Sequence, residues 1–398
     1  MGYFVNAIVV IDGEHYPPVV RDALAALPYD VIGVWPAGGT EKLRGGEQRT
    51  SEAYGVPVVE GFEGAEIVVD LSDEPVMSPP RRFAVASRAL ALGIPYVGAD
   101  FRFDPPAFKP FPLPSIAVIG TGKRVGKTAI TGHVARTLAR DANVVVVAMG
   151  RGGPAEPEVI DAPPTLDSLL TLSRGGRHAA SDHFETALAA GVVTIGCRRA
   201  AGGLAGAVTY SNVDGGARLA AERDPDVVVF DGSGAAIPPI AVDKRILVVG
   251  PGQDATAYLN AYRVLISDLV VVLGRAGADA IRALKDVPVI PVELCLRPLE
   301  ALRGRRAAVF TTGPAPIDHL DADVVAVSRN LGDRGRLRAD LEGTDADVYV
   351  VELKAAAIDV VAEFAMKRGV EVVLAVNDVV SEKLDEHLRA LLPTGAKV

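Results

Sequence analysis

The chain of 398 residues is long enough for two or three domains and for a substantial apolar core. Apolar residues make up 49% of it and charged residues 23%, a balance that excludes an intrinsically disordered protein. The 50 acidic residues outnumber the 41 basic ones, and the formal charge of −9 argues against broad binding of nucleic acid or of an anionic membrane.

The cysteine content and the apolar runs indicate the cellular compartment of the protein. Cys197 and Cys295 are too few for a disulfide framework, which favours a reducing compartment. Asp12 and Glu14 interrupt the apolar run near the start, so it does not have the pattern of a secretory signal. No apolar run approaches the ~20 residues that a membrane span requires. We therefore expect a cytoplasmic protein with neither a membrane nor a nucleic acid as its partner.

Short Val/Ile-rich runs alternate with helical stretches along the chain, which predicts an α/β fold with parallel sheets. A first unit, residues 1–112, has the pattern of a Rossmann-like domain. Three alternating prolines between Lys109 and Ser115 favour an extended connector and mark its end. The elements predicted in this unit are strands at 7–11, 31–35 and 67–71 and helices at 19–26 and 83–92.

Two further units follow the connector. In residues 113–302 we expect strands at 116–119, 144–148, 227–230, 246–249 and 269–273. A basic run, 303–306, then opens a smaller α/β unit, residues 303–398, with strands near 307–310, 324–327, 348–351 and 370–374. The stretch 382–392 places leucines on one face and predicts a packed amphipathic helix.

A glycine-rich loop, GTGKRVGKT, separates the strand at 116–119 from a helix that begins near Lys127. This is the position and composition of a phosphate-binding loop, in which backbone N–H groups and a helix N-terminus face phosphate oxygens. Lys127 would reach the β and γ phosphates, and the Thr128 hydroxyl would hold Mg²⁺. A strict motif has glycine where this chain has Thr121, so the loop is a variant. The expected nucleotide-binding residues are Gly120, Thr121, Gly122, Val125, Gly126, Lys127 and Thr128.

The run VVVFDGSG places Asp231 at the end of a buried strand in the same unit. Such an aspartate can hold the water shell of Mg²⁺ opposite Thr128. No Asn/Thr-Lys-x-Asp tetrapeptide, the usual guanine-reading motif, occurs in the chain, so ATP is preferred to GTP. Residues 113–302 are thus predicted to form a P-loop NTPase-type parallel sheet core.

The motifs resemble those of two families. GTGKRVGKT, together with Asp231–Gly234 and Pro238, is similar to the loops of dethiobiotin synthetase. The combination of VVIDGEHYPPVV, Val9 to Val20, with GTGKRVGKT and MGRGGP, Met149 to Pro154, more closely resembles the cyclic 2,3-diphosphoglycerate synthetase family, over most of the chain. That resemblance implies an ATP-dependent ligase that closes 2,3-bisphosphoglycerate into a cyclic pyrophosphate and releases ADP and phosphate.

This chemistry needs no protein nucleophile, because one substrate phosphate attacks the γ-phosphoryl group of ATP and the other then closes the ring. Catalysis should consist of positioning and charge neutralisation. Cations in or near the loop are therefore the catalytic candidates. They are Lys127, Lys123, Arg124, which can act as an internal arginine finger or remain a solvated loop residue, and Arg151.

Substrate-binding candidates follow expected strands, where parallel sheets bind their ligands. Arg151 and Gly152 follow one strand, and Arg198 and Arg199 follow an apolar run, although the latter pair fits a plain surface role equally well. In the first unit, expected to bind substrate, the candidates are His15 and the loop of Gly38, Gly39 and Thr40, with a structural histidine and a simple turn as the alternatives. Glu352 and Lys354 follow a strand of the last unit, from which they could approach either the nucleotide or the substrate.

Other functions remain open on sequence alone. A dethiobiotin-type carboxylase acting on a diamine would need fewer substrate-facing cations than this chain offers. A dethiobiotin-synthetase-like ligase acting on another acid is a further alternative. A nucleotide-switch ATPase of the chromosome-partitioning type has a second lysine five residues before the loop lysine, where this chain has Gly122. A regulatory GTPase lacks its guanine motif here. A homodimer is plausible because relatives with this loop type often work as dimers.

Overall fold

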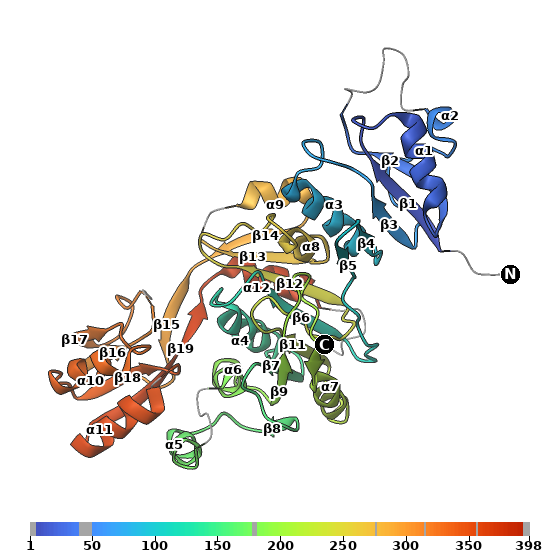
Figure 1. Ribbon diagram of the computed structural model, residues 1–398. Coiled ribbons are helices and arrows are strands. Elements are labelled where there is room, and N and C mark those ends of the chain that lie inside the picture. The colour runs from blue at the N-terminus through green and yellow to red at the C-terminus, as the bar shows by residue number, and fades with distance from the viewer. Residues whose placement is uncertain are drawn as a thin grey trace. The chain divides into compact units, whose positions relative to one another are not determined.

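The computed structural model describes residues 5–39, 50–176, 181–274, 277–313, 316–355 and 357–392. They form two compact units, each described by itself below (Figure 1). The first unit combines the described residues up to Pro106 with Asp254–Ile266 and Asp279–Asp286. The second contains Ala107–Gln253, Ser267–Ala278 and the described residues from Val287 onward. The sequence-based division into three domains stays a prediction.

The first unit is built on a five-stranded sheet in the order β2-β1-β3-β4-β5, parallel except for the last pair. Its strands are β1 (Asn6–Ile11), β2 (Asp30–Pro36), β3 (Ile67–Asp70), β4 (Tyr96–Val97) and β5 (Arg102–Phe103). Its helices are α1 (Pro17–Ala26), α2 (Ser51–Tyr54), α3 (Pro79–Ala91), α8 (Asn260–Leu265) and α9 (Ala278–Leu284), which begins at the unit boundary.

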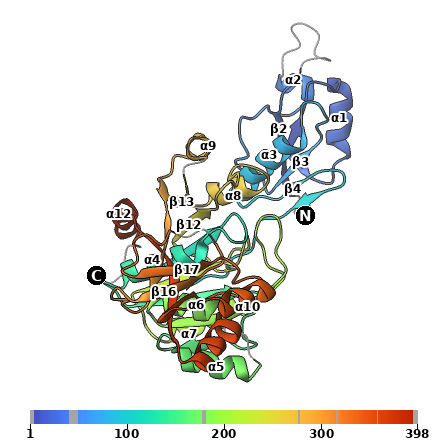
Figure 2. The ribbon, with the colours of Figure 1, turned by 90° about the vertical axis from the view of Figure 1, so that its left-hand side faces the viewer.

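Helix α8 comes from far along the chain and packs on α3, and Figures 1 and 2 show the two side by side. The rings of Phe83 and Tyr258 meet edge to face with centroids 5.4 Å apart. Leu259, just before α8, and Tyr262 within it are both buried. The core of the first unit is therefore completed by residues that follow most of the second unit in sequence.

A nine-stranded sheet, called here the central sheet, forms the middle of the second unit. Its main order is β10-β9-β7-β11-β6-β12-β13-β14, with β8 paired to β9. All neighbours are parallel except for the pairs that β8 and β10 make with β9. The strands are β6 (Ser115–Gly120), β7 (Val144–Gly150), β8 (Glu158–Ile160), β9 (Thr194–Ala200), β10 (Tyr210–Ser211), β11 (Val227–Asp231), β12 (Lys244–Val249), β13 (Leu269–Leu273) and β14 (Val289–Val292).

Helices α4 (Lys127–Leu138), α5 (Leu166–Arg174), α6 (Asp182–Ala190), α7 (Val213–Ala221) and α12 (Glu382–Ala390) accompany this sheet. The core strands are almost wholly buried Val, Ile and Ala, as expected for parallel strands covered on both faces. Leu384 and Leu388 of α12 lie in the same core as α4, which confirms the amphipathic helix predicted at the carboxyl-terminal stretch.

A second sheet of this unit, called here the C-terminal sheet, has the order β15-β19-β18-β16-β17. Its strands are β15 (Leu294–Pro298), β16 (Arg306–Phe310), β17 (Asp323–Ser328), β18 (Val348–Glu352) and β19 (Glu371–Val379). Its helical segments are α10 (Arg334–Glu342), a π-helical turn (Ala357–Ala362) and α11 (Glu363–Arg368). Only β15 is antiparallel to its neighbour.

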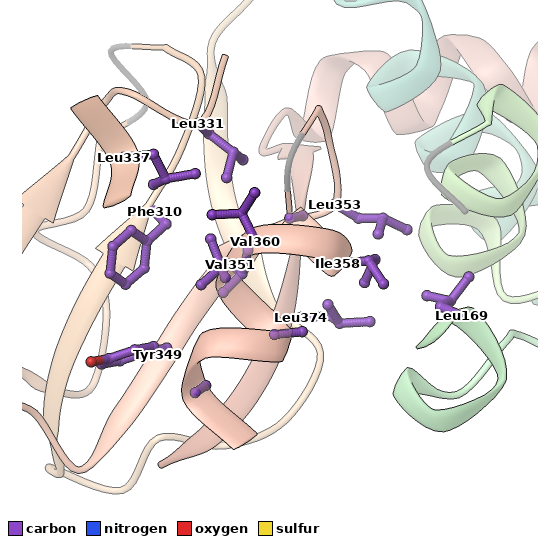
Figure 3. Packing of buried hydrophobic residues seen from close by; sticks show 14 of the residues in the cluster. Leu169, Phe310, Leu331, Leu337, Tyr349, Val351, Leu353, Ile358, Val360 and Leu374 are labelled. Carbon is purple, nitrogen blue, oxygen red and sulfur yellow. The ribbon is translucent and has the colours of Figure 1, made fainter. Parts of the chain in front are cut away.

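One apolar core joins the C-terminal sheet to helices α5 and α6. Leu169 and Phe184 from those helices are buried in the same cluster as Phe310, Val351 and Leu374 of the sheet. Figure 3 shows Leu169 beside the cluster residues contributed by the C-terminal sheet and its loops. The C-terminal sheet is therefore packed onto a helical layer of the central sheet by continuous apolar contact.

The α/β class with parallel sheets is confirmed, and every predicted strand exists within a few residues of its expected bounds. Helix α1 begins at Pro17 rather than at residue 19, because proline is well suited to the first turn of a helix. The last strand was predicted to end at residue 374 but runs to Val379. The short strands β4, β5, β8 and β10 had no apolar run long enough to predict them. Strands β9, β14 and β15 were not predicted either.

Candidate functional site

The phosphate-binding loop connects β6 to α4 at the carboxyl edge of the central sheet, with β11 and β12 as the neighbours of β6. Gly126 has a left-handed backbone, φ 79°, and a Cβ there would stand 2.5 Å from Leu273 Cδ1. Only glycine fits such a position. Arg124 also has a positive φ of 62°, which is uncommon for a residue with a side chain and marks a strained turn.

Lys127, the first residue of α4, is buried and points toward the end of β11. Its Nζ donates to Asp231 Oδ1 at 2.7 Å, and Thr131 Oγ1 donates to the same oxygen at 2.9 Å. Burial raises the pKa of Asp231, while these two donors oppose that rise. The structure thus brings together Lys127 and Asp231, predicted separately from sequence. Thr131 was missed, although its place one turn after Lys127 was a readable signal.

The loop cations Lys123 and Arg124 are exposed. Within the described residues, neither side chain forms a hydrogen bond or ion pair, so both are available to an anion. Thr128 is half-buried in the first turn of α4. Val125, which was expected to contribute to nucleotide binding, has a buried side chain packed on Gly250 and Gly120.

Gln253 is a loop neighbour that the sequence analysis missed. Thr121 Oγ1 donates to Gln253 Oε1, and the Thr121 amide donates to Val248 O at 3.1 Å. A Cβ on Gly122 would meet the Gln253 amide at 3.0 Å. The signal for Gln253 was its place just after β12, at the same edge of the sheet as the loop.

Arginines gather at the ends of β7 and β9. Arg151 follows β7 and is exposed, with no hydrogen bond or ion pair among the described residues. Arg199 donates to Ser233 O at 2.8 Å and to Ala201 O at 2.9 Å, which places it beside the loop after β11. Burial and the nearby charge of Arg151 lower the pKa of Arg199. Arg151 is thus near enough to Arg199 to act on its pKa, as is the carboxylate of Asp182, which raises it. Guanidinium groups gathered in this way suit an anion.

The backbone around Gly153 fixes the loop of Arg151 and Gly152. A Cβ at Gly153 would stand 2.1 Å from Cys197 O, so the loop packs directly on the backbone of β9. Arg198, the next residue of β9, lies over the ring of Tyr210 at 5.8 Å from its centroid. Arg198 is thus directed to the outer strand β10, whereas Arg199 faces the loop after β11.

Asp182, at the start of α6, is a site residue that the sequence analysis did not identify. Its carboxylate lies over Gly150, because a Cβ there would be 3.0 Å from Asp182 Oδ2. It is exposed, and its carboxylate has no hydrogen-bond or ion-pair partner in the described part of the chain. It also contributes to the raised pKa of Asp231. An isolated aspartate in a helical segment gives no sequence signal of this position.

His15 and Gly39 lie in the first unit, at the carboxyl end of its sheet. His15 Nδ1 is 2.7 Å from Asp12 Oδ1, and its Nε2 is 3.4 Å from Asp73 Oδ2. Gly39 has a φ of 75°, and a Cβ there would stand 2.6 Å from Glu14 Oε1. Thr40 lies outside the described residues. The ring of His15 is oriented by two carboxylates, and its side chain is 32% exposed.

Thr128 and Asp231, the residues predicted to hold Mg²⁺, carry hard oxygen ligands of the type that this ion prefers. No cluster of three or more His, Cys, Asp or Glu residues suited to a metal occurs in the described ranges. Mg²⁺ commonly binds through one or two protein ligands with phosphates and water completing its shell. The two residues fit that mode of binding, and they do not form an all-protein metal cage.

Family models for three parts of one enzyme match the chain in sequence order. The cyclic 2,3-diphosphoglycerate synthetase N-terminal domain matches residues 6–104, its P-loop domain residues 115–282 and its C-terminal domain residues 298–378. The chain belongs to the cyclic 2,3-diphosphoglycerate synthetase family. This membership confirms the resemblance inferred from the loop motifs and the P-loop type of the central sheet.

Relatives in this synthetase family align over nearly the whole chain. Cyclic 2,3-diphosphoglycerate synthetase of Rubrobacter xylanophilus is 46% identical and covers 97% of both chains. The Thermococcus kodakarensis protein of the same name is 40% identical over 98% of both chains. Among solved structures, LpxK from Aquifex aeolicus in complex with ATP covers 72% of this chain and 91% of its own, with 15% identity and a TM-score of 0.39.

The helices of this synthetase-family chain are short. In the ranges that the structure describes, none combines the length and the apolar character required to span a membrane.

Proposed function

We propose that this chain is an ATP-dependent ligase that converts 2,3-bisphosphoglycerate to cyclic 2,3-diphosphoglycerate, with release of ADP and phosphate. The observation that carries the proposal is the full-length match to synthetases of this name, at up to 46% identity over 97% of the chain. The phosphate-binding loop supports ATP as the energy source, since its glycines, Lys127 and helix α4 form the standard cradle for phosphates.

The reaction has two balanced steps. An oxygen of one substrate phosphate attacks the γ-phosphorus of ATP, the bond to the β-phosphate oxygen breaks, and ADP leaves. An oxygen of the other substrate phosphate then attacks the phosphorus of the first, and inorganic phosphate leaves as the ring closes. Both steps move phosphoryl groups between oxygens, so positioning and neutralisation of charge supply the catalysis.

The nucleotide would bind along Gly120, Thr121, Gly122, Val125 and Gly126 through backbone N–H groups. Lys127 would then exchange its 2.7 Å contact with Asp231 for the β and γ phosphates. This exchange frees Asp231 to act, with Thr128, on the water shell of Mg²⁺, which when bound neutralises charge on the phosphates. Lys123 and Arg124 would stabilise the charge on the transferring group.

The substrate phosphates would meet cations at the ends of β7 and β9. Support comes from Arg151 and Arg199, whose guanidinium groups lie close together, and from Gly152, whose backbone lies in the same loop. We assign them, with Arg198, to substrate binding. Substrate binding by His15 and Gly39, which belong to the first unit, stays a prediction from the sequence.

A cytoplasmic location and a homodimeric assembly complete the proposal. The scarcity of cysteines supports a reducing compartment. Sedimentation velocity of the purified protein tests the dimer, and a monomer at micromolar concentration would contradict it.

The decisive test of the activity is ³¹P NMR of the purified protein with ATP, Mg²⁺ and 2,3-bisphosphoglycerate. The proposal expects ADP, phosphate and a cyclic pyrophosphate signal to appear together. ATP hydrolysis without the cyclic product, or no turnover, would overturn it and favour another acid substrate or a nucleotide switch.

A further inference from the structure

The C-terminal sheet has a point at which its strand order reverses. From β16 the chain passes to β17 on one side, and it then returns to β18 on the other side of β16. In parallel sheets, ligands bind beyond the carboxyl ends of the strands at such a point. The residues that follow β16 and β18 here are Thr311 and Thr312 on one strand end and Leu353 and Lys354 on the other.

Glu352, the last residue of β18, fixes the geometry at this point. It is 2% exposed. It accepts hydrogen bonds from Thr311 Oγ1 at 2.8 Å and from the amide and hydroxyl of Thr312 at 2.7 and 2.9 Å. Asn377 Nδ2 on β19 donates to its other oxygen at 2.6 Å. A buried carboxylate with four donors is fully satisfied, so Glu352 holds the loops rigidly. Lys354, two residues later, is then the charged residue of this strand end whose head group is only partly buried.

The side chain of Lys354 extends to the helical layer of the central sheet. Its Nζ donates to Glu185 Oε1 on α6 at 2.9 Å, and its side chain is 35% exposed. Burial alone would lower the pKa of Lys354, but Glu185 and Glu352 raise it, so the ammonium group stays charged. An ammonium group has three N–H donors, and Glu185 is the one acceptor assigned to it among the described residues. Lys354 can therefore receive a further anion.

Helix α6 places this contact next to the nucleotide-binding edge. Asp182 lies one turn before Glu185 on α6, and its carboxylate lies over Gly150 at the end of β7. Asp182 is close enough to Asp231 and to Lys354 to raise the pKa of both. Lys354 thus faces the carboxyl edge of the central sheet, although it belongs to a different sheet.

The apolar core that joins the two sheets keeps this arrangement fixed. Phe184, the neighbour of Glu185, is buried in the same cluster as Leu353, the neighbour of Lys354. Figure 3 shows Leu353 within this cluster. The position of Lys354 relative to α6 is therefore set by packing on both sides of the ion pair, and not by the ion pair alone.

We propose that Lys354 binds a phosphate group of 2,3-bisphosphoglycerate, exchanging Glu185 for the substrate. The inference rests on the proposed function and adds a substrate-binding residue from the C-terminal sheet. The substrate carries two phosphates and a carboxylate, so it needs more cations than the phosphate-binding loop provides. A lysine on a flexible four-carbon stem can move from one anion to another while its backbone stays fixed. Glu185 acts as a positioning residue that holds Lys354 before the substrate arrives.

The test measures binding without turnover. Calorimetry follows 2,3-bisphosphoglycerate binding to protein loaded with Mg²⁺ and a non-hydrolysable ATP analogue. Lys354→Met should weaken substrate binding by about ten- to a hundredfold, the usual effect of losing a hydrogen bond between charged groups. Binding of the ATP analogue should change by less than about threefold. Glu185→Gln removes the competing anion and should leave substrate affinity unchanged or higher.

Two variants separate this role from a structural one. Lys354→Met/Glu185→Gln leaves no unpaired buried charge and should still bind the substrate weakly. Arg174→Met breaks an ion pair with Glu363, 2.8 Å long, that joins α5 to α11 across the same packed region but far from the strand ends in sequence. This control should bind both ligands as the wild type does.

The inference is overturned if the double variant binds 2,3-bisphosphoglycerate as tightly as the wild type. It is also overturned if Lys354→Met weakens the binding of both ligands equally and lowers the melting temperature, because that result indicates a purely structural ion pair. The wild type could bind 2,3-bisphosphoglycerate and make no cyclic product while Lys354→Met loses that binding. This result would support the role of Lys354 and overturn the proposed reaction. A wild type that does not bind 2,3-bisphosphoglycerate would overturn both.

Discussion

Lys127 and Asp231 form a buried ion pair where two neighbouring strands of the central sheet end. Lys127 is 9% exposed and Asp231 is 1% exposed, so each charge depends on the other. Pairs of this kind are costly to break by removing one partner. We expect the pair to have a role in binding as well, since Asp231 would keep Lys127 directed toward the phosphate site until an anion replaces the carboxylate.

We expect Lys127→Ala to lower turnover by at least about a hundredfold, because a cation directed at the transferring phosphate is lost. The fold should persist, since β6, β11 and α4 are held together by a shared apolar core that the substitution leaves intact. A coupled assay for ADP and circular dichroism measure the two effects. Lys244→Ala, at the amino end of β12, is the control and should keep full turnover. Full turnover in Lys127→Ala would remove the loop from the mechanism.

Gly153 offers a test of the substrate arginines that leaves their charge intact. A methyl group there would meet Cys197 O at 2.1 Å, so Gly153→Ala must displace the loop that carries Arg151. Steady-state kinetics should show KM for 2,3-bisphosphoglycerate rising more than KM for ATP, and Arg151→Ala should change them in the same direction. Gly332→Ala, with open space around its Cβ, is the matched control. An equal rise in both KM values would point to a nucleotide role for Arg151.

At the scale of elements, a network of charged side chains connects α4 to β15, β19 and α12, which come much later in the chain. Asp378 of β19 accepts hydrogen bonds from Arg136 of α4 and, at 2.6 Å, from Arg297 of β15. His133 of α4 lies 2.7 Å from Asp385 of α12 and 3.6 Å from Asp378. The helix that starts with Lys127 is thus anchored toward its other end by charges from three elements.

The network predicts a pH dependence of stability. Burial alone would raise the pKa of Asp378, but His133 and the two arginines hold it well below its usual range. A carboxyl whose pKa is depressed by folding stabilises the fold above its unfolded pKa of about 3.9, and that stability is lost as pH falls further. Asp378→Asn should therefore cost about 3 kcal/mol at pH 7 and progressively less below pH 4.

Urea unfolding of wild type and Asp378→Asn between pH 3 and pH 7 measures this difference. The control is Asp345→Asn. The Asp345 side chain is 93% exposed and pairs with Arg306, so its loss should change the free energy of unfolding by less than about 0.5 kcal/mol. A constant difference between Asp378→Asn and wild type across the whole pH range would show that the carboxylate charge is not what stabilises the network.

The strands and the glycine-rich loop could be predicted from sequence because each depends on residues that are neighbours in the chain. Apolar runs predicted most of the long strands, and the glycine-rich run before Lys127 predicted the loop between β6 and α4, where the structure brings Lys127 and Asp231 together. The strand β19 was predicted to end at residue 374, two apolar residues before Asn377 and Asp378 interrupt the run, whereas it continues through them to Val379. Their partners, Glu352, Arg136 and Arg297, come from other elements. Asp182 and Gln253 were missed for the same reason, since only the folded sheet brings them to its edge.

At the scale of the whole molecule, nucleotide binding should act on one of two compact units. The phosphate-binding loop, Asp231 and Gln253 all lie in the second unit. A ligand at a hundredfold excess over its Kd stabilises the unit that binds it by about 2.7 kcal/mol. In calorimetry, Mg²⁺ with a non-hydrolysable ATP analogue should raise the melting transition of the second unit. Hydrogen exchange should slow around residues 120–131 in the same complex. Protection confined to the first unit would contradict the site.

Helix α8 gives the chain a particular order of folding during synthesis. The face of α3 around Phe83 is covered by Tyr258 and its neighbours, which emerge from the ribosome only after strands β6 to β12. The amino-terminal part of a nascent chain usually folds first, as each domain emerges. Here that part must wait with an exposed apolar face while most of the central sheet is made. The segment synthesised first is thus among the last to be completed, and a fragment ending at the proline connector would lack the helix that closes its core.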